Sequence, residues 1–208
     1  MKNLLHVILL LVSGGTICMA IEEPSYKILK SDGKIEIREY QSYIIAETFI
    51  PAQVMDEASN AAFKVLFKYI TGNNNSKSDI AMTAPVTTTR SEKIEMTAPV
   101  STTRSAGGYT VAFTLPMKYT LATSPVPADT SVHLREIPSR IVAVIRFSGR
   151  WTDESMEEHE QELVQWMKTN GYPSVGIPVI ARYDPPFMPW FLRRNEIQIG
   201  VGPQNNGK

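Results

Sequence analysis

The sequence has almost no cysteine. Cys18 is the only one in 208 residues, and it lies in the apolar N-terminal segment. The rest of the chain therefore has no thiol with which to form an internal disulfide, so its folded state must be stabilised by a packed core alone. The same lack excludes a thiolate nucleophile and a cysteine-ligated metal from everything that follows Cys18.

The sequence also has no net charge. It contains 21 basic and 21 acidic residues, which gives a formal charge of zero at pH 7 with neutral histidines. Such a balance gives no reason to expect nucleic acid or an anionic membrane surface as a partner, because both attract strongly basic proteins.

Long apolar runs are missing too. The run Leu4–Val12 follows a positively charged start, is too short to span a membrane as a stable helix, and leads into small and polar residues that end at Ala20. This pattern predicts a secretory signal peptide over residues 1–20, cleaved near Ala20, and hence a periplasmic or secreted protein. Cys18 leaves lipoprotein processing as the alternative. We expect residues 21–208 to form one monomeric domain without a membrane span.

Motifs for catalysis and metal binding are absent. His133 falls on the solvent side of a predicted strand and His159 lies among glutamates on a solvated helix face, so neither is expected to act as a ligand or base. Gly107-Gly108 is explained as a turn rather than as a phosphate loop. No residue spacing is typical of a metal site. What remains is apolar surface with few polar groups, which favours binding over catalysis.

The sequence does contain a close repeat. Residues 80–91, IAMTAPVTTTRS, return as residues 94–105, IEMTAPVSTTRS. Apolar and polar residues alternate in each copy, which predicts strands, and the polar link between the copies predicts an antiparallel hairpin. A third alternating run extends the hairpin to a meander, and its predicted inward residues are Val111, Phe113 and Leu115.

Two explanations of this repeat stay open. The hairpin is either duplicated for packing alone or forms a wall beside a ligand groove, with Met82 and Met96 as adaptable apolar surface. Pro85 and Pro99 cannot donate hydrogen bonds to a sheet, so both are expected at bulges, strand ends or edges.

A weaker repeat covers most of the chain. Residues 35–50 and residues 132–147 have the same phase of apolar residues, and a predicted helix follows each of them. The sequence therefore predicts an α+β fold with an internal duplication of the unit strand–strand–helix–strand. The two halves are residues 26–118 and 130–201, approximately.

The first predicted helix, residues 54–70, has more apolar surface than one core face needs. One stripe, which we expect to face the core, holds Val54, Ala58, Ala61, Ala62, Val65 and Tyr69. A second apolar set lies outside that stripe and consists of Met55, Phe63, Leu66, Phe67 and Ile70. Together they exceed the ~100° stripe of a surface helix, so the second side needs more protein, a partner or an apolar ligand to cover it.

A proline-rich loop, residues 184–192, carries further apolar side chains. These are Phe187, Met188, Trp190 and Phe191. Large apolar groups on a loop need burial or a ligand. Arg193 and Arg194, which follow the loop, either bind a ligand carboxylate or pair with Glu196 or Asp184 to hold the loop, and we favour the second explanation.

Several motifs together resemble the SOUL haem-binding protein family over about residues 26–201. They are Met82-Thr-Ala-Pro-Val86, its repeat Met96-Thr-Ala-Pro-Val100, Tyr183-Asp-Pro-Pro186 and Arg193-Arg-Asn-Glu-Ile197. The resemblance implies a distorted eight-stranded β-barrel of two pseudo-symmetric halves, each with a packed helix. It also implies non-covalent binding of haem or another tetrapyrrole, without enzymatic turnover.

The resemblance places the tetrapyrrole in an apolar groove between the first helix and the proline-rich loop. By position, the binding residues are Met55, Phe63, Phe67, Lys68, Tyr183 and Met188. Two positions depart from the family: Glu39 replaces a histidine proposed as an iron ligand in one branch, and Met188 replaces a lysine thought to contact a propionate in another. The metal ligand is therefore unknown, and the candidates are Met55, Met82, Met96, Met188 and Tyr183.

Two other functions stay open at this point. One is a small-molecule effector-binding or hydrolytic domain of the same two-half fold, for which Glu39 or Glu47 should point inward with a raised pKa. The other is a protein-interaction module in which the apolar side of the first helix binds a partner.

Overall fold

The computed structural model describes residues 21–77 and 90–203. One sheet contains β1 (Tyr26–Asp32), β2 (Ile35–Tyr40), β3 (Tyr43–Ile50), β5 (Val100–Ser105), β6 (Gly108–Thr114), β8 (His133–Ile137), β9 (Arg140–Phe147), β10 (Ser174–Arg182) and β11 (Asn195–Val201). The other elements are α1 (Met55–Ile70), α2 (Asp153–Thr169), the 3-10 turn η1 (Trp190–Leu192) and the short pair β4 (Asn74–Asn75) and β7 (Val126–Pro127). Within this described part, neither helix is long and apolar enough to cross a bilayer.

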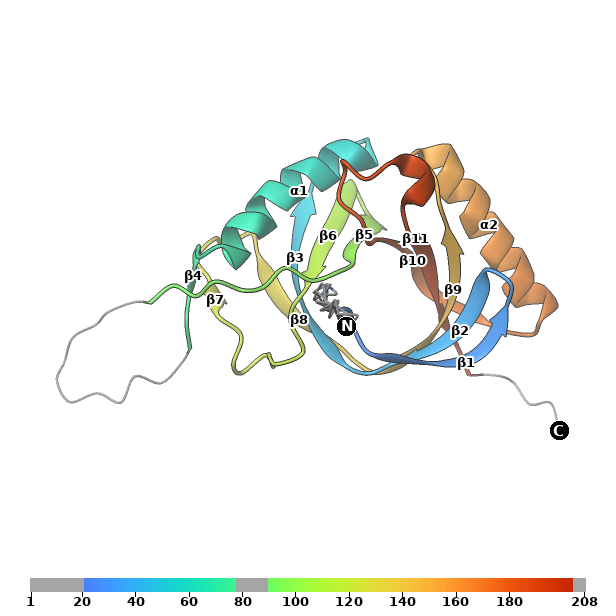
Figure 1. Cartoon of the computed structure of the whole chain (residues 1–208), viewed down its shortest axis with the longest axis horizontal. Helices are drawn as coiled ribbons and strands as arrows, with labels where there is room; N and C mark the ends of the chain where they lie inside the picture. The colour runs from blue at the N-terminus through green and yellow to red at the C-terminus, as the bar shows by residue number, and fades with distance from the viewer. Residues whose placement is uncertain (1–20, 78–89, 204–208) are drawn as a thin grey trace, which may run out of the picture.

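The α+β class is confirmed, but the eight-stranded barrel is not. The sheet has nine antiparallel strands in the order β1-β2-β9-β11-β10-β5-β6-β3-β8, with β1 and β8 at its ends. The ninth strand is the N-terminal β1, which pairs only with β2 in this order. The sheet curves strongly, and both helices lie on its outer side (Figure 1).

The two segments with matching apolar phase are partners in the sheet. β2 pairs with β9 from Ile35↔Ile145 to Tyr40↔Arg140, and β3 pairs with β8 from Tyr43↔Ile137 to Glu47↔His133. The two pairs of strands have the same register. Residues 35–47 therefore lie antiparallel to residues 133–145 throughout. Apart from β1 and the two-residue β4, the first half has the strand and helix order β2-β3-α1-β5-β6, which matches β8-β9-α2-β10-β11 of the second half. An origin by internal duplication stays a prediction.

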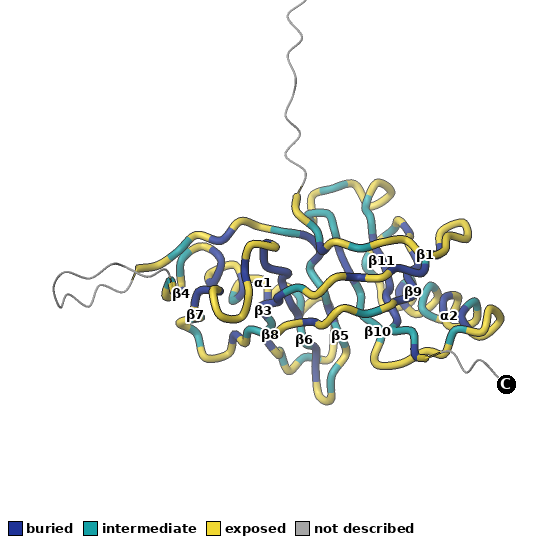
Figure 2. The backbone as a smooth tube through the Cα atoms, turned by 90° about the horizontal axis from the view of Figure 1, so that it is seen from below, coloured by how far each residue is buried: buried dark blue, intermediate teal, exposed yellow. Residues whose placement is uncertain are grey.

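The helices cover the outer side of the sheet with two separate apolar cores. Leu163 and Met167 of α2 pack against a cluster that includes Ile37, Ile145 and Ile197. Residues of α1 pack against a second cluster, which contains Ile44, Ala46, Val111, Phe113 and Leu115. The inward direction predicted for Val111, Phe113 and Leu115 is therefore confirmed. Figure 2 shows these buried stretches in dark blue, whereas the turns between strands are mostly exposed.

The core face of α1 differs from the predicted stripe. Its buried residues are Met55, Ala58, Ala62, Leu66, Tyr69 and Ile70. Ala61 is exposed and Val54 is 45% exposed, so both were assigned to the wrong side. The larger Leu66 and Ile70 fill the core instead, and the Tyr69 hydroxyl donates to Pro125 O at 2.9 Å. A wide apolar arc does not reveal which of its sides is buried.

The close repeat does not form the predicted hairpin. Most of its first copy, including Met82 and Pro85, lies outside the described residues. In the second copy, residues 94–99 are not in the sheet, because their backbone pairs elsewhere: Ile94 N donates to Ile70 O and Ala98 N donates to Glu22 O. The strand begins only at Val100, directly after Pro99, and its hairpin partner is β6.

Two substitutions in α1 test which of its faces contributes to the stability of the fold. Leu66 is fully buried, so Leu66→Ala should lower the free energy of unfolding by about 2–5 kcal/mol. Phe67 on the next position is 41% exposed, and Phe67→Ala should cost about 1 kcal/mol or less. Urea unfolding followed by circular dichroism measures both. Equal losses for the two variants would contradict this orientation of the helix.

Candidate functional site

α1 presents two aromatic rings that the described protein does not cover. Phe63 and Phe67 lie one turn apart, with ring centroids 5.6 Å apart and an interplanar angle of 14°. They remain 39% and 41% exposed. The Phe63 ring also meets Phe113 of β6 edge-on at 5.3 Å, which fixes the pair on the surface of the core. The result is a flat apolar surface that is rigid on its inner side.

Two lysines run beside this aromatic pair. Lys64 and Lys68 each follow one of the phenylalanines, and both are exposed. Since each α-helical residue advances by about 100°, Lys64 and Lys68 form a row along the helix that is one such step round from the row of the two phenylalanines. Lys68 was predicted from the resemblance, whereas Lys64 was missed. Its position four residues before Lys68 was the available signal. The surface formed by these four residues is called the α1 surface below.

The proline-rich loop lies between the N-terminal ends of the two helices (Figure 1). It exposes four large apolar side chains, namely Phe187, Trp190, Phe191 and Leu192. Phe187 is the most exposed of them at 86%. Apolar groups so exposed are typical of a surface that binds a partner or a ligand.

Arginines hold the backbone of this loop, as the favoured explanation required. Arg193 donates from Nε to Met188 O at 2.8 Å and from Nη2 to Pro186 O at 2.6 Å. Asp184 accepts a hydrogen bond from Arg194 N at 2.5 Å. Both arginines are therefore engaged within the protein, and Arg194 also pairs with Glu196 at 2.9 Å.

A tryptophan links the loop to α1. The Trp151 ring lies between two guanidinium groups, with Arg193 at 4.2 Å and Arg182 at 4.6 Å from its centroid. Arg182 in turn reaches Asp56 in the first turn of α1, with Nη2 and Oδ1 3.4 Å apart. The loop and the first helix are thus joined by a chain of cation–π and ionic contacts.

The structure does not gather all six predicted site residues. Phe63, Phe67 and Lys68 share the α1 surface, and Met188 is half-buried in the loop. Met55 is 2% exposed and belongs to the core cluster under α2. The Tyr183 hydroxyl donates to Glu196 Oε2 at 2.8 Å on the inner side of the sheet. The predicted binding roles of these residues stay predictions.

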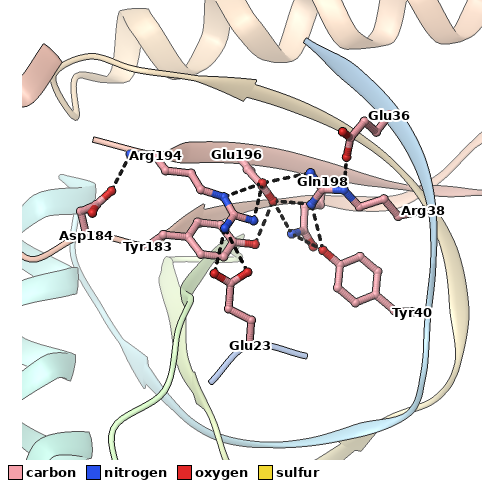
Figure 3. Close-up of polar contacts among 9 residues, drawn as sticks. All are labelled: Glu23, Glu36, Arg38, Tyr40, Tyr183, Asp184, Arg194, Glu196 and Gln198. Carbon is pink, nitrogen blue, oxygen red and sulfur yellow. Dashed lines mark hydrogen bonds and ion pairs between the residues drawn. The ribbon is translucent and has the colours of Figure 1, made fainter. Parts of the chain in front are cut away.

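A buried ionic network, of which sequence reasoning anticipated only the pair Arg194 and Glu196, lies on the inner side of the sheet (Figure 3). Arg38 of β2 donates to both carboxylate oxygens of Glu196 of β11, at 2.8 and 3.1 Å. Arg38 is 2% exposed and Glu196 is 0% exposed. Arg194 donates from Nε to Glu196 at 3.0 Å and from Nη1 to Glu23 at 2.8 Å, which joins the N-terminal segment to the network.

The charges of this network shift the pKa of its members. Burial alone would raise the pKa of Glu196, but the hydrogen bonds and positive charge of Arg38, with the charge of Arg194, outweigh burial and lower that pKa. Burial and the nearby Glu196 carboxylate raise the pKa of the Tyr183 hydroxyl, so it stays a donor. Burial likewise raises the pKa of Tyr40 to about 12. The network is thus a fixed arrangement of charges rather than an acid–base pair.

The residues considered for catalysis do not form a site. His133 is exposed, as predicted. His159 is not on a solvated face: its ring stacks on Phe147 at 3.9 Å, and its Nδ1 lies 2.7 Å from Ser155 O. Among residues 21–77 and 90–203, no group of three or more histidine, cysteine, aspartate or glutamate side chains could hold a metal ion.

Neither of the two glutamates expected in an effector-binding domain is both inward-facing and unpaired. Glu39 is exposed. Glu47 accepts two hydrogen bonds from Arg135, at 2.8 and 2.6 Å. Glu47 also faces the inner side of the sheet, but its carboxylate is held by Arg135; the fully buried glutamate on that side is Glu196, whose pKa is lowered rather than raised.

The fold and these motifs match a known family. A sequence model of the SOUL heme-binding protein family matches residues 21–200, so the chain belongs to this family. Heme-binding protein 1 of Xenopus tropicalis is 27% identical over 162 residues, which cover 78% of this chain and 80% of the relative. Heme-binding protein 2 of Mus musculus is 25% identical and covers 90% of this chain and 94% of the relative.

Solved structures of other proteins share the fold. The C-terminal domain of EcmrR has a TM-score of 0.59 at 13% identity, over 85% of this chain and 98% of that chain. A hydrolase from Listeria innocua has a TM-score of 0.53 at 10% identity, over 84% of this chain and 94% of that chain. At such low identity these similarities show a shared fold and nothing about activity.

The buried network gives a prediction for stability against pH. Because the folded state lowers the pKa of Glu196, the stability from its pairing is fully present above the ordinary glutamate pKa of about 4.3 and is lost as pH falls through the lowered value. Glu196→Gln should cost about 3 kcal/mol at neutral pH, because the buried charge of Arg38 then keeps only one carboxylate partner, Glu36 at 2.6 Å. The variant should also lose less stability than the wild type on acidification.

Urea unfolding at neutral pH and below about pH 4 measures this difference. Glu39→Gln is the matched control, since Glu39 is an exposed glutamate of the same strand as Arg38. An acid sensitivity that is identical in Glu196→Gln and wild type would show that the network does not set it.

Proposed function

We propose that this protein binds haem or another tetrapyrrole non-covalently at the α1 surface, beside the proline-rich loop, and that it catalyses no reaction. The observation that carries the proposal is the stacked, exposed pair Phe63 and Phe67 next to Lys64 and Lys68. Membership of the SOUL heme-binding protein family supports the ligand class, as do the names of the similar proteins.

The chemistry of a tetrapyrrole fits this surface. Its macrocycle is flat and apolar and can lie against the two rings. Because the rings are only 39% and 41% exposed, covering what remains contributes about 1 kcal/mol for each phenylalanine. Its propionates carry negative charge and can reach the lysine row, since ammonium groups on flexible stems bind carboxylates as point charges. Exposed apolar side chains of the loop, such as Phe187 and Trp190, can cover the edge of the ring.

Iron ligation is not the basis of this binding. Met55 is buried in the core, and the Tyr183 hydroxyl is already bound to Glu196. Met188 and Met96 are the remaining described candidates, with Met96 48% exposed and Met188 half-buried. Metal-free protoporphyrin IX should therefore bind about as tightly as haem.

Titration with hemin tests the proposal. The protein should give a saturable Soret shift at micromolar hemin or below. The double variant Phe63→Ala with Phe67→Ala should weaken binding about tenfold or more, because it removes both rings of the contact surface. Protoporphyrin IX dimethyl ester should bind more weakly than protoporphyrin IX, because it has no free carboxylate for Lys64 and Lys68.

The control is Ile28→Ala with Val164→Ala, which removes two exposed apolar side chains from β1 and α2. It should leave binding unchanged. The proposal is wrong if hemin gives no saturable shift, or if the phenylalanine variant binds like the control. A concentration-dependent dimer that buries Phe63 and Phe67 would instead favour a protein-interaction module.

We further propose that the chain is exported and cut near Ala20. The backbone becomes firmly held just after this point: Glu22 accepts hydrogen bonds from Ala98 N at 2.9 Å and Met117 N at 2.6 Å, and Glu23 pairs with Arg194. A cut near Ala20 would leave these contacts intact. N-terminal sequencing of the protein from its native host should begin at Ile21 or within a residue or two of it, and an intact N-terminus would contradict export by this route.

A further inference from the structure

A polar cleft lies on the inner side of the sheet, on the face opposite to the α1 surface. Residues alternate along β3, so that Ile44 and Ala46 pack under α1 while Tyr43, Ile45 and Glu47 face the cleft. The cleft has a volume of about 430 Å³, which is within the range of small-molecule sites. Its lining includes the hydroxyl residues Ser101, Thr103, Ser105 and Thr110.

The cleft carries a cationic group with an unused donor. Arg140 lines it, and within the described part of the chain the buried Nε of Arg140 has no hydrogen-bond partner. Its Nη2 donates to the Tyr43 hydroxyl at 3.3 Å, a long bond that leaves the guanidinium weakly held. Arg135, the second arginine of the cleft, is already paired with Glu47 at 2.6 Å. A buried unpaired N–H next to a cation favours an anionic acceptor.

An apolar cleft continues from the same arginine. Its volume is about 520 Å³, and it shares Arg140, Ile177 and Val179 with the polar cleft. Its other side chains are largely aliphatic and include Ile141, Val175 and Val201. Arg140 therefore lies where a hydroxyl-lined cleft meets an aliphatic one.

We propose that this double cleft binds an amphipathic monocarboxylate, such as a medium-chain fatty acid. The carboxylate pairs with the guanidinium group of Arg140, while the hydrocarbon chain lies along Ile177, Val179 and Val175. A cationic amphiphile does not fit, because Glu47 is neutralised by Arg135 and Arg140 would repel it. An inorganic anion would leave the aliphatic part of the cleft uncovered.

This site is independent of the tetrapyrrole proposal. Its residues belong to β3, β5, β6, β8, β9, β10 and β11 and to the segment just after β11, and none of them is on α1 or in the proline-rich loop. A failure of haem binding therefore does not affect it, and the converse also holds.

Calorimetric titration with decanoate, below its micelle concentration, tests the proposal. Decanoate should bind saturably, whereas decanol and decyltrimethylammonium, which have the same chain length, should bind about tenfold more weakly or not at all. Arg140→Gln should weaken decanoate binding about tenfold or more and leave hemin binding unchanged. Arg146→Gln is the matched control, because Arg146 is an exposed arginine of the same strand and should have no effect.

A second variant keeps the test valid if Arg140→Gln folds poorly. Ile177 is 59% exposed, so Ile177→Asp should be tolerated, and its carboxylate should repel the ligand from the junction of the two clefts. The proposal is overturned if decanoate does not bind saturably, if decanol binds as tightly, or if folded Arg140→Gln or Ile177→Asp binds decanoate like the wild type.

Discussion

The ion pair between Arg38 and Glu196 is the interaction on which the arrangement of this protein depends. It joins β2 of the first half to β11 of the second, and Arg194 extends it to Glu23 in the N-terminal segment. Two opposite charges so deeply buried persist only when each has hydrogen-bonding partners, and Tyr183 and Arg194 supply those for Glu196. The network fills one part of the inner side of the sheet with fixed charge. Apolar ligands are therefore expected on the outer surface or in the part of the inner side that the network leaves open.

α1 combines a stabilising face and a binding face in one helix. Leu66 and Tyr69 are fully buried and attach it to the sheet, while Phe63 and Phe67 stay about two-fifths exposed although their complete burial would add stability. Retaining two exposed rings is understandable if a ligand covers them. The Trp151 contacts with Arg182 and Arg193 hold the proline-rich loop next to the start of the same helix, so both apolar surfaces are presented together. Binding would then require little ordering of the backbone.

Periodicity in the sequence predicted most strands and both helices, whereas the origin of the two halves by duplication stays a prediction. Periodicity failed where the same pattern of apolar and polar residues fits more than one structural environment. Alternation in residues 35–40 marks Ile35 and Ile37 as core, but it cannot tell that Arg38 on the other side is also covered by protein. Residues 94–99 alternate like a strand, yet their backbone pairs with Ile70 and Glu22 instead. Phe63, Phe67 and Lys68 were predicted from the resemblance, and the helical spacing from Lys68 could also have identified Lys64. The cleft at Arg140 required the three-dimensional arrangement, because its lining comes from strands far apart in the sequence.

The central claim is that the α1 surface, rather than the inner side of the sheet, holds the tetrapyrrole. A crystal structure of the complex with protoporphyrin IX tests it most directly. The account predicts a macrocycle lying against Phe63 and Phe67, with a propionate within about 4 Å of the ammonium group of Lys64 or Lys68. A macrocycle bound between the strands of the inner side, with α1 still exposed to solvent, would contradict it.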